Sequence, residues 1–188
     1  MWDYAGIFPP AELPLDEALA EWRRIRASDD AWLVNRLVVR TEHVQVCGSE
    51  PLAVVEGHEE RQGDAVFREG ETKLRCGGGR VPPIDEVAEF VRRCRAEGLR
   101  FKATAGLHHA LPTDGEHGFL NLLAACVFGD EEGMLATRDI ALDAVSFRAA
   151  GRAADSEACA RVRRELFASI GSCSFAEPVG ELQELGIL

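Results

Sequence analysis

The chain has 188 residues, 46% of them hydrophobic and 28% charged, a balance typical of a soluble globular protein with a core of ordinary size. Its net charge of −11 argues against a nucleic-acid or anionic-membrane surface. No apolar run approaches the roughly 18 residues of a membrane-spanning helix. The first ten residues lack the basic and apolar regions of a signal peptide, and the six cysteines show no disulfide or zinc-finger spacing. We therefore expect a cytoplasmic protein with no nucleic-acid or membrane partner.

Hydrophobic periodicity predicts strands and helices that alternate along the chain. In chain order we expect a strand at 3–8, a helix at 15–26, strands at 31–39 and 52–56, a polar loop at 57–63, a strand at 72–76, a helix from 84 that ends at Gly98, a strand at 100–105, helices at 117–128 and 130–137, a strand at 142–148, and helices at 156–169 and 178–185. Residues 65–67 are too few to assign. The clearest unit is the strand, helix and strand over 72–105, which implies parallel neighbours joined by a right-handed crossover.

This alternation predicts an α/β fold with a mostly parallel sheet of five or six strands. A complete (β/α)8 barrel takes about 250 residues, so we expect a partial or shortened (β/α)-barrel-like architecture in a single domain over residues 1–188. Parallel sheets need covered faces and edges. We therefore also expect a homodimer or larger homo-oligomer.

Only two lysines occur against nineteen arginines, and both lie near the end of a predicted strand. Lys73 and Lys102 belong to the two strands of the clearest unit, so they lie side by side if those strands are neighbours. Two ammonium groups about 4 Å apart at an effective dielectric of about 20 repel by roughly 4 kcal/mol, enough to make one amine a neutral nucleophile. The plainer alternative is pairing with carboxylates, for which Asp3 and Glu56 are candidates because each lies in a predicted strand.

Polar residues and glycines accompany the lysines at the strand ends, where α/β folds place their active face. Arg75 shares a strand face with Lys73, as Thr104 does with Lys102. Gly77 and Gly78 follow the first strand and precede a helix, so their backbone N–H groups could approach an anion, although a plain turn is the simpler explanation.

Three of the five histidines lie within ten residues, directly after the second lysine strand. His108, His109 and His117 could form a metal site, because imidazole binds zinc and iron well. Adjacent residues of an extended segment point apart, however, so His108 and His109 cannot easily bind one ion. Acid–base work by one histidine is the other functional interpretation, and a structural or solvated loop is the third.

Five segments across the chain stand out: DYAGIFPPA at 3–11, KLRCGG at 73–78, FKATAGLHH at 101–109, HGFLN at 117–121 and GSCSFAEP at 171–178. Together they resemble the signature segments of a poorly characterised bacterial family of β/α-barrel-like hypothetical proteins. That resemblance implies a barrel-like fold and supplies no established reaction. The chain is shorter than the family pattern between about Val46 and Thr72, where further β/α units would be expected.

A shorter stretch carries a second resemblance. KLRCG, a helix and then KATAG are similar to the two-lysine strand pair of deoxyribose-phosphate aldolase and related class I aldolases. In those enzymes the first lysine forms the Schiff base and the second lowers its pKa. The resemblance thus implies that Lys73 is the nucleophile and Lys102 its neighbour.

These patterns favour a carbon–carbon lyase that acts on a small carbonyl substrate, with or without an anionic group, through a lysine imine and without a cofactor or metal. Proton transfer falls to His108 or His109. The substrate-binding residues would be Arg75, Thr104, Gly77, Gly78, Asp3 and Glu56. Two alternatives stay open: a metal-dependent lyase or isomerase that uses His108, His109 and His117, and a non-catalytic binding protein on a shortened barrel.

Overall fold

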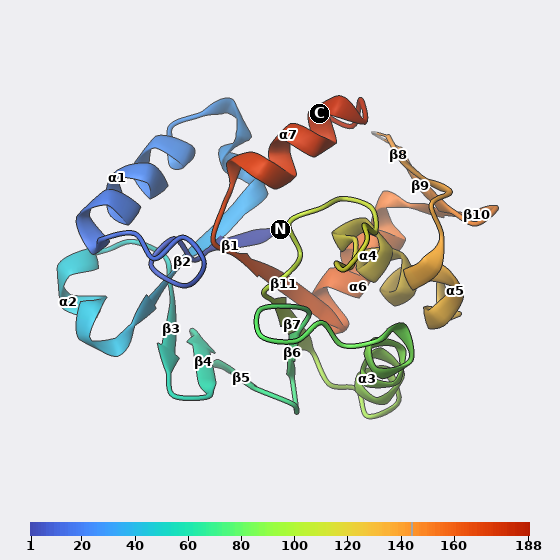
Figure 1. Cartoon of the computed structure of the whole chain (residues 1–188), viewed down its shortest axis with the longest axis horizontal. Coiled ribbons are helices and arrows are strands. Elements are labelled where there is room, and N and C mark those ends of the chain that lie inside the picture. The colour runs from blue at the N-terminus through green and yellow to red at the C-terminus, as the bar shows by residue number, and fades with distance from the viewer. Residues whose placement is uncertain (144) are drawn as a thin grey trace.

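A mostly parallel sheet of eight strands forms the centre of the protein, whose computed structural model describes residues 1–143 and 145–188 (Figure 1). In chain order its strands are β1 (Trp2–Tyr4), β2 (Val34–Arg40), β3 (Leu52–Glu56), β4 (Glu59–Gln62), β5 (Ala65–Arg68), β6 (Lys73–Arg75), β7 (Phe101–Thr104) and β11 (Phe167–Ser172). Their order across the sheet is β5-β4-β3-β2-β1-β11-β7-β6. All neighbours from β3 to β6 in this order are parallel, whereas β4 and β5 are antiparallel additions.

The sheet curls until its two ends face each other. Glu60 on β4 contacts Lys73 on β6 and Lys102 on β7, although these strands stand near opposite ends of the sheet order. The result is a nearly closed, barrel-like arrangement whose interior is polar. The expected α/β fold with a mostly parallel, partial-barrel sheet is therefore confirmed.

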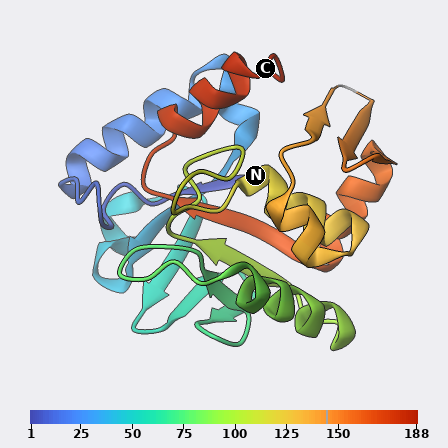
Figure 2. The same cartoon turned by 45° about the vertical axis from the view of Figure 1, so that its right-hand side comes forward.

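Helices pack around the outside of this sheet (Figure 1). They are α1 (Leu15–Arg26), α2 (Val44–Cys47), α3 (Ile84–Ala96), α4 (Phe119–Phe128), α5 (Glu131–Ala136), α6 (Ser156–Glu165) and α7 (Ala176–Glu184). Apolar residues at helical spacing bury one face of α1 and of α3. Figure 2 shows α3 alongside β7, where the rings of Phe90 and Phe101 meet edge to face with centroids 5.3 Å apart. The ring of Phe167 packs against Phe101 in a tilted arrangement with a centroid distance of 5.2 Å. No helix in the described part of the chain is long and apolar enough to span a membrane.

A hairpin of β4 and β5 replaces the polar loop expected at 57–63. Gly57 and Gly63 adopt positive φ angles of 58° and 61° in the two tight turns that flank β4, a backbone conformation that suits glycine. Figure 1 shows this hairpin at the lower edge of the molecule without a helix outside it. The resemblance to the barrel-like family led us to expect further β/α units between about Val46 and Thr72. Instead, the short antiparallel strands β4 and β5 continue the sheet there.

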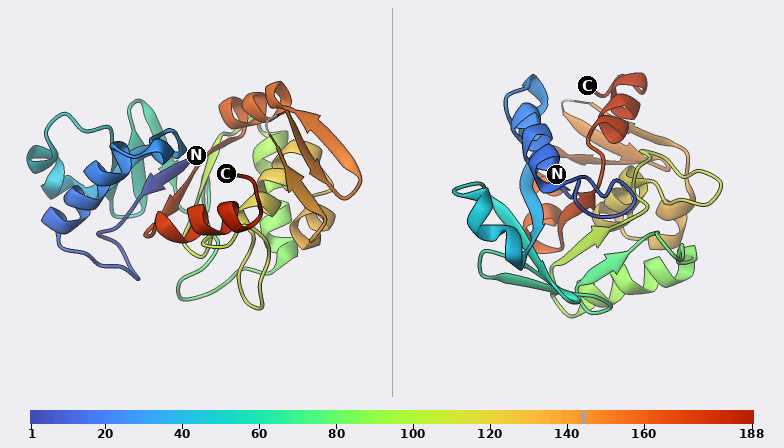
Figure 3. Two further views of the ribbon diagram at one scale, coloured as in Figure 1. Left: turned by 90° about the horizontal axis from the view of Figure 1, so that it is seen from above. Right: turned by 60° about the vertical axis from the view of Figure 1, so that its left-hand side comes forward.

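In the C-terminal third of the chain, a predicted helix is in part a strand. The helix predicted over 156–169 ends at Glu165, and Phe167–Ser172 forms β11 in the middle of the sheet. All six residues of β11 are buried, so this strand lacks the alternation that would separate it from a buried helix in sequence. The predicted strand at 142–148 spans parts of β8 (Ile140–Leu142) and β9 (Ser146–Ala149), which join β10 (Arg152–Asp155) in a separate antiparallel sheet beside α6 (Figure 3); residue 144 lies outside the described residues.

Candidate active site

The two lysines occupy paired positions on neighbouring strands. Lys73 on β6 and Lys102 on β7 are register partners in the parallel pair, as are Arg75 and Thr104 two residues further along. The prediction that the lysine strands are parallel neighbours, with the lysines on one face, is therefore confirmed. Both side chains point into the barrel, where they meet a carboxylate of β4.

Glu60 bridges the two lysines. One of its carboxylate oxygens, Oε2, lies 3.1 Å from Nζ of Lys73, and the other, Oε1, accepts a hydrogen bond from Nζ of Lys102. Glu60 is the acid beside the lysines, whereas Glu56 is exposed at the end of β3 next to the β3–β4 turn. The expectation that Glu56 is a counter-charge or a substrate-binding residue is thus corrected by the structure, because the inward positions fall on the hairpin.

Asp3 provides the second carboxylate and is completely buried. Its Oδ2 accepts hydrogen bonds from Nζ of Lys102 at 2.7 Å, Nε2 of Gln62 at 2.7 Å and Oγ of Ser169 at 2.6 Å. Gln62 also donates to Oε1 of Glu60 at 3.0 Å, so one continuous network joins β1, β4, β7 and β11. The expected pairing of Asp3 with a lysine is confirmed, and its role is to hold Lys102.

Charges within this network cancel, because two carboxylates face two ammonium groups. Burial acts to lower the pKa of Lys102, but the adjacent carboxylates of Asp3 and Glu60 outweigh it and place the pKa above its ordinary value. Burial likewise acts to raise the pKa of Glu60, yet Lys102 and Lys73 hold that pKa below its usual range. The adjacent acids thus favour the charged form of Lys102, and they offset the repulsion expected between the two lysines.

A cavity of about 550 Å³ opens at the C-terminal ends of the strands, above this network. The side chain of Lys73 is 11% exposed, whereas that of Lys102 is 0% exposed, so Lys73 is the lysine that a small molecule can reach. The residues around the cavity come from many strand ends and loops, among them Phe8, Val38, Val55, Glu60, Lys73, Arg75, Gly78, Thr104, His108, Glu116 and Cys173. Its position agrees with the face where barrel enzymes carry their active sites.

Arg75 and Thr104 line this cavity, as expected, and the glycines nearby have different roles. Arg75 lies at the rim, with a distance of 3.7 Å between Nε and Oε1 of Glu69, and its guanidinium is half exposed. Gly78 borders the cavity next to this guanidinium. Gly77 is buried against Gly106, and a Cβ on either would lie 2.6–2.7 Å from the Cα of the other. Gly77 is therefore a packing residue that joins the ends of β6 and β7.

The three histidines diverge. His108 lines the cavity, and its Nδ1 lies 3.2 Å from a carboxylate oxygen of Glu177 without the alignment of a hydrogen bond. His109 instead pairs with Glu181 of α7, and this hydrogen bond raises its pKa above the ordinary value.

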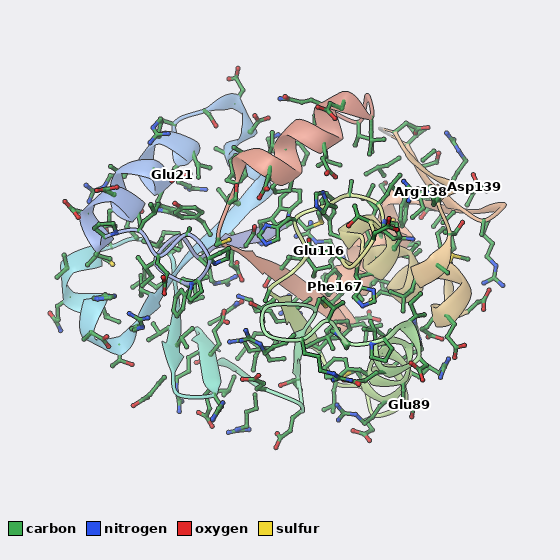
Figure 4. All side chains as sticks on the ribbon, viewed as in Figure 1. Glu21, Glu89, Glu116, Arg138, Asp139 and Phe167 are labelled. Carbon is green, nitrogen blue, oxygen red and sulfur yellow. The ribbon has the colours of Figure 1, made fainter. Side chains whose placement is uncertain are left out.

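The third histidine, His117, is buried, and its Nε2 lies 2.7 Å from the carbonyl oxygen of Pro82. Among the described residues no group of three His, Cys, Asp or Glu side chains is arranged to hold a metal ion. The histidines thus contact three different partners, and only His108 belongs to the cavity. Glu116, labelled in Figure 4, lies between His109 and His117 in the sequence and also lines the cavity.

Sequence reasoning did not find Glu60, Gln62 or Ser169. Glu60 and Gln62 alternate with outward Glu59 and Arg61, so every residue of β4 is polar and the usual apolar alternation is missing. The Gly-Asp pair at 63–64, which separates the residues of β4 from those of β5, is a sequence signal for a tight turn between two antiparallel strands. Ser169 lies in β11, within a stretch whose sequence predicts the end of a helix.

Comparisons of the chain with family models, with curated proteins and with solved structures found no match. The resemblances to a bacterial barrel-like family and to class I aldolases therefore stay predictions that rest on the short segments quoted above. Any function assigned to the cavity has to come from the side chains that surround it.

Proposed function

We propose that the protein is an imine-forming enzyme, a carbon–carbon lyase of the class I aldolase kind, with Lys73 as its nucleophile. One observation carries the proposal: the partly exposed amine of Lys73 borders a cavity, while a fully buried Lys102 lies next to it in register and is ion-paired with Asp3 and Glu60. A second cationic group next to a lysine amine is one way in which such an amine is activated as a nucleophile.

In this mechanism Glu60 removes the proton from the amine of Lys73. The sequence alone predicts instead that repulsion between the two lysines releases that proton. The ammonium group of Lys73 must lose a proton before its nitrogen can attack a carbonyl carbon, and Oε2 of Glu60 lies 3.1 Å away as an acceptor. Attack forms the carbon–nitrogen bond, and loss of water leaves a protonated imine. Lys102 keeps its charge next to Glu60 throughout, which holds the carboxylate in place between the two strands.

Carbon–carbon cleavage then follows from the electron demand of the imine. The protonated imine accepts the electron pair of the breaking bond, while a base removes the proton of the hydroxyl group on the departing carbon, which becomes a carbonyl. His108 is the histidine on the cavity wall and is the group that we assign to this proton. Arg75 at the rim, with its exposed guanidinium and only a loose contact to Glu69, would bind an anionic substituent of the substrate.

The test is reductive trapping. Borohydride with a panel of short aldehydes and keto acids, with and without a phosphate or carboxylate group, should add a stable mass to the chain at Lys73. With two lysines in the sequence, peptide mapping separates Lys73 from Lys102 and from the α-amino group. Lys73→Arg should abolish the adduct, because a guanidinium stays protonated and forms no imine.

Glu60→Gln is the second variant, and it should slow trapping at Lys73, because it removes the proton acceptor 3.1 Å from the amine nitrogen. Arg161→Gln serves as the matched control, because this exposed residue on α6 lies outside the site. No adduct on the wild-type protein across the panel, or an adduct that persists in Lys73→Arg, would overturn the proposal and leave a non-catalytic binding role ahead.

A further inference from the structure

A second cavity, of about 640 Å³, lies between β6 and α3 and has no part in the chemistry proposed above. Three apolar side chains line it, those of Leu74 on β6, Pro82 in the following loop and Phe90 on α3. Lys73 and Arg75 point into the barrel, so Leu74 between them points to the outer face of the sheet. The second cavity is therefore on the helix side of β6. We call it the α3 cavity, and the one around Lys73 the lysine cavity.

The α3 cavity adjoins the lysine cavity at the free edge of β6. Glu69, Lys73 and Arg75 line both cavities. β6 is the last strand in the sheet order, so in the described part of the chain no further strand closes the sheet beside it. The backbone N–H of Gly70 donates to the carbonyl oxygen of Lys73 at 3.1 Å and covers the edge at that residue, whereas the edge at Arg75 has no strand beside it. A ligand bound at Lys73 can therefore continue past Arg75 onto the outer face.

The charged groups around the α3 cavity leave one guanidinium available to a ligand. Arg80 donates two hydrogen bonds to Glu86, at 2.9 and 2.6 Å, so this pair is self-satisfied. Arg93 donates to two backbone carbonyl oxygens of the turn before β6, both at 2.9 Å. Arg75 makes no side-chain hydrogen bond within residues 1–143 and 145–188, and its Nε lies 3.7 Å from the carboxylate of Glu69. An anion is therefore expected at Arg75, where the two cavities meet.

The apolar part of the α3 cavity is held in place and is open to a ligand. The ring of Phe90 packs edge to face on Phe101, and the guanidinium carbon of Arg93 lies 5.1 Å from its centroid. Gly79 borders the cavity from the loop before α3, and a Cβ placed there would meet nothing within 4 Å. The space beyond Arg75 thus combines a fixed aromatic surface with open room, which favours an apolar or aromatic ligand group.

We infer that the substrate carries its anionic group in the middle of the molecule, at Arg75, and an apolar or aromatic tail beyond it, in the α3 cavity. Its carbonyl end lies at Lys73, and for that end the inference rests on the proposed function. Two residues along a strand span about 7 Å, so several bonds separate the carbonyl carbon from the anion. A phosphate ester with an apolar substituent has this order of groups, because its anion lies between the two ends.

The test is calorimetric titration of the full chain with methyl phosphate and with phenyl phosphate, at pH 7 and constant ionic strength. Phenyl phosphate should bind about tenfold more tightly, because its ring is partly removed from water against Phe90 and Leu74. Gly79→Leu fills the open room and should lower the affinity for phenyl phosphate to that for methyl phosphate. Gly79→Ala adds only a methyl group there and should keep most of the preference. Phe90→Ala should reduce the preference to about threefold or less.

Two further variants show where the esters bind. Arg75→Gln should weaken both esters by a similar factor, because it removes the partner of their shared anion. Trp32→Ala removes an aromatic ring that is 69% exposed outside both cavities, and it should change neither affinity. Far-UV circular dichroism shows whether each variant is folded. Equal affinity of the wild type for the two esters, no saturable binding of either below about 10 mM, a preference that survives in folded Gly79→Leu, or one that is lost in Trp32→Ala would each overturn the inference.

Reductive trapping separates this inference from the proposed function. Propanal has neither an anionic group nor a tail, so borohydride should trap it at Lys73 equally well in the wild type and in Gly79→Leu. Absence of that adduct together with an intact preference for phenyl phosphate would overturn the imine chemistry and retain the α3 cavity as a ligand site. Trapping at Lys73 without any preference for phenyl phosphate would do the reverse.

Discussion

Replacing Lys102 by methionine is the strongest test of the buried network. The substitution keeps the volume of the side chain and removes its charge. Asp3, 0% exposed, then loses its ion-pair partner, and Glu60, 2% exposed, keeps only its contact with Lys73. Breaking a buried ion pair in this way costs about 3–5 kcal/mol of the free energy of unfolding. For a chain of this size, the melting temperature should fall by roughly 10 °C.

The loss should also depend on pH. In the wild type, burial opposes ionisation of Glu60, but Lys102 and Lys73 hold its folded pKa below the unfolded value. That stabilisation is present above the unfolded pKa and is lost as the pH falls through the folded pKa. In the variant Glu60 keeps only the contribution of Lys73, so less of this stabilisation is present at pH 7 to be lost on acidification. The stability difference between the two proteins should therefore narrow from pH 7 to about pH 4.

Urea unfolding followed by circular dichroism at several pH values measures this difference. Lys73→Met is the matched control, and it should cost less because Glu60 keeps its contact with Lys102. Adding Asp3→Asn to Lys102→Met should recover part of the loss, because the buried charge that lost its partner is removed. A cost below about 1 kcal/mol at pH 7, or a difference that does not narrow on acidification, would refute the account of a charged, fully paired Lys102.

Three further predictions concern other parts of the molecule. Gly106→Ala should destabilise the protein by about 1–3 kcal/mol in thermal unfolding, because the residue has a φ of 62° and its Cβ would lie 2.7 Å from Cα of Gly77; no measurable change would show that the loops move apart freely. The pKa of His109, measured by NMR titration, should lie above 6.5 and should fall in Glu181→Gln, and the pair's contribution to stability should be present below the unfolded pKa and lost as the pH rises through the folded pKa. Burial raises the pKa of Cys76 to about 12, so this thiol should resist a thiol reagent at pH 8 in the folded chain and react at once in urea.

Hydrophobic spacing along the chain was enough to predict the helices and strands that bury one apolar face. The helix at 15–26 and the strand at 52–56 are found at the predicted bounds, because one apolar stripe and one short β-branched run decide each of them locally. The pairing of Lys73 with Lys102 also follows from sequence, since a strand, helix and strand of this length permits few arrangements other than parallel neighbours.

Elements that face the polar interior could not be predicted in the same way. Glu60 and Gln62 have the composition of a loop, and in the strand their side chains are satisfied inside the barrel by Asp3 and Lys102 from distant parts of the chain. Ser169 belongs to a strand buried on both faces, whose sequence does not distinguish a strand from a buried helix. The sequence by itself thus determined the α/β class and the lysine pair, whereas only the tertiary structure decided which acids neutralise the lysines, because hydrogen-bond satisfaction between residues far apart in the chain leaves no local periodicity.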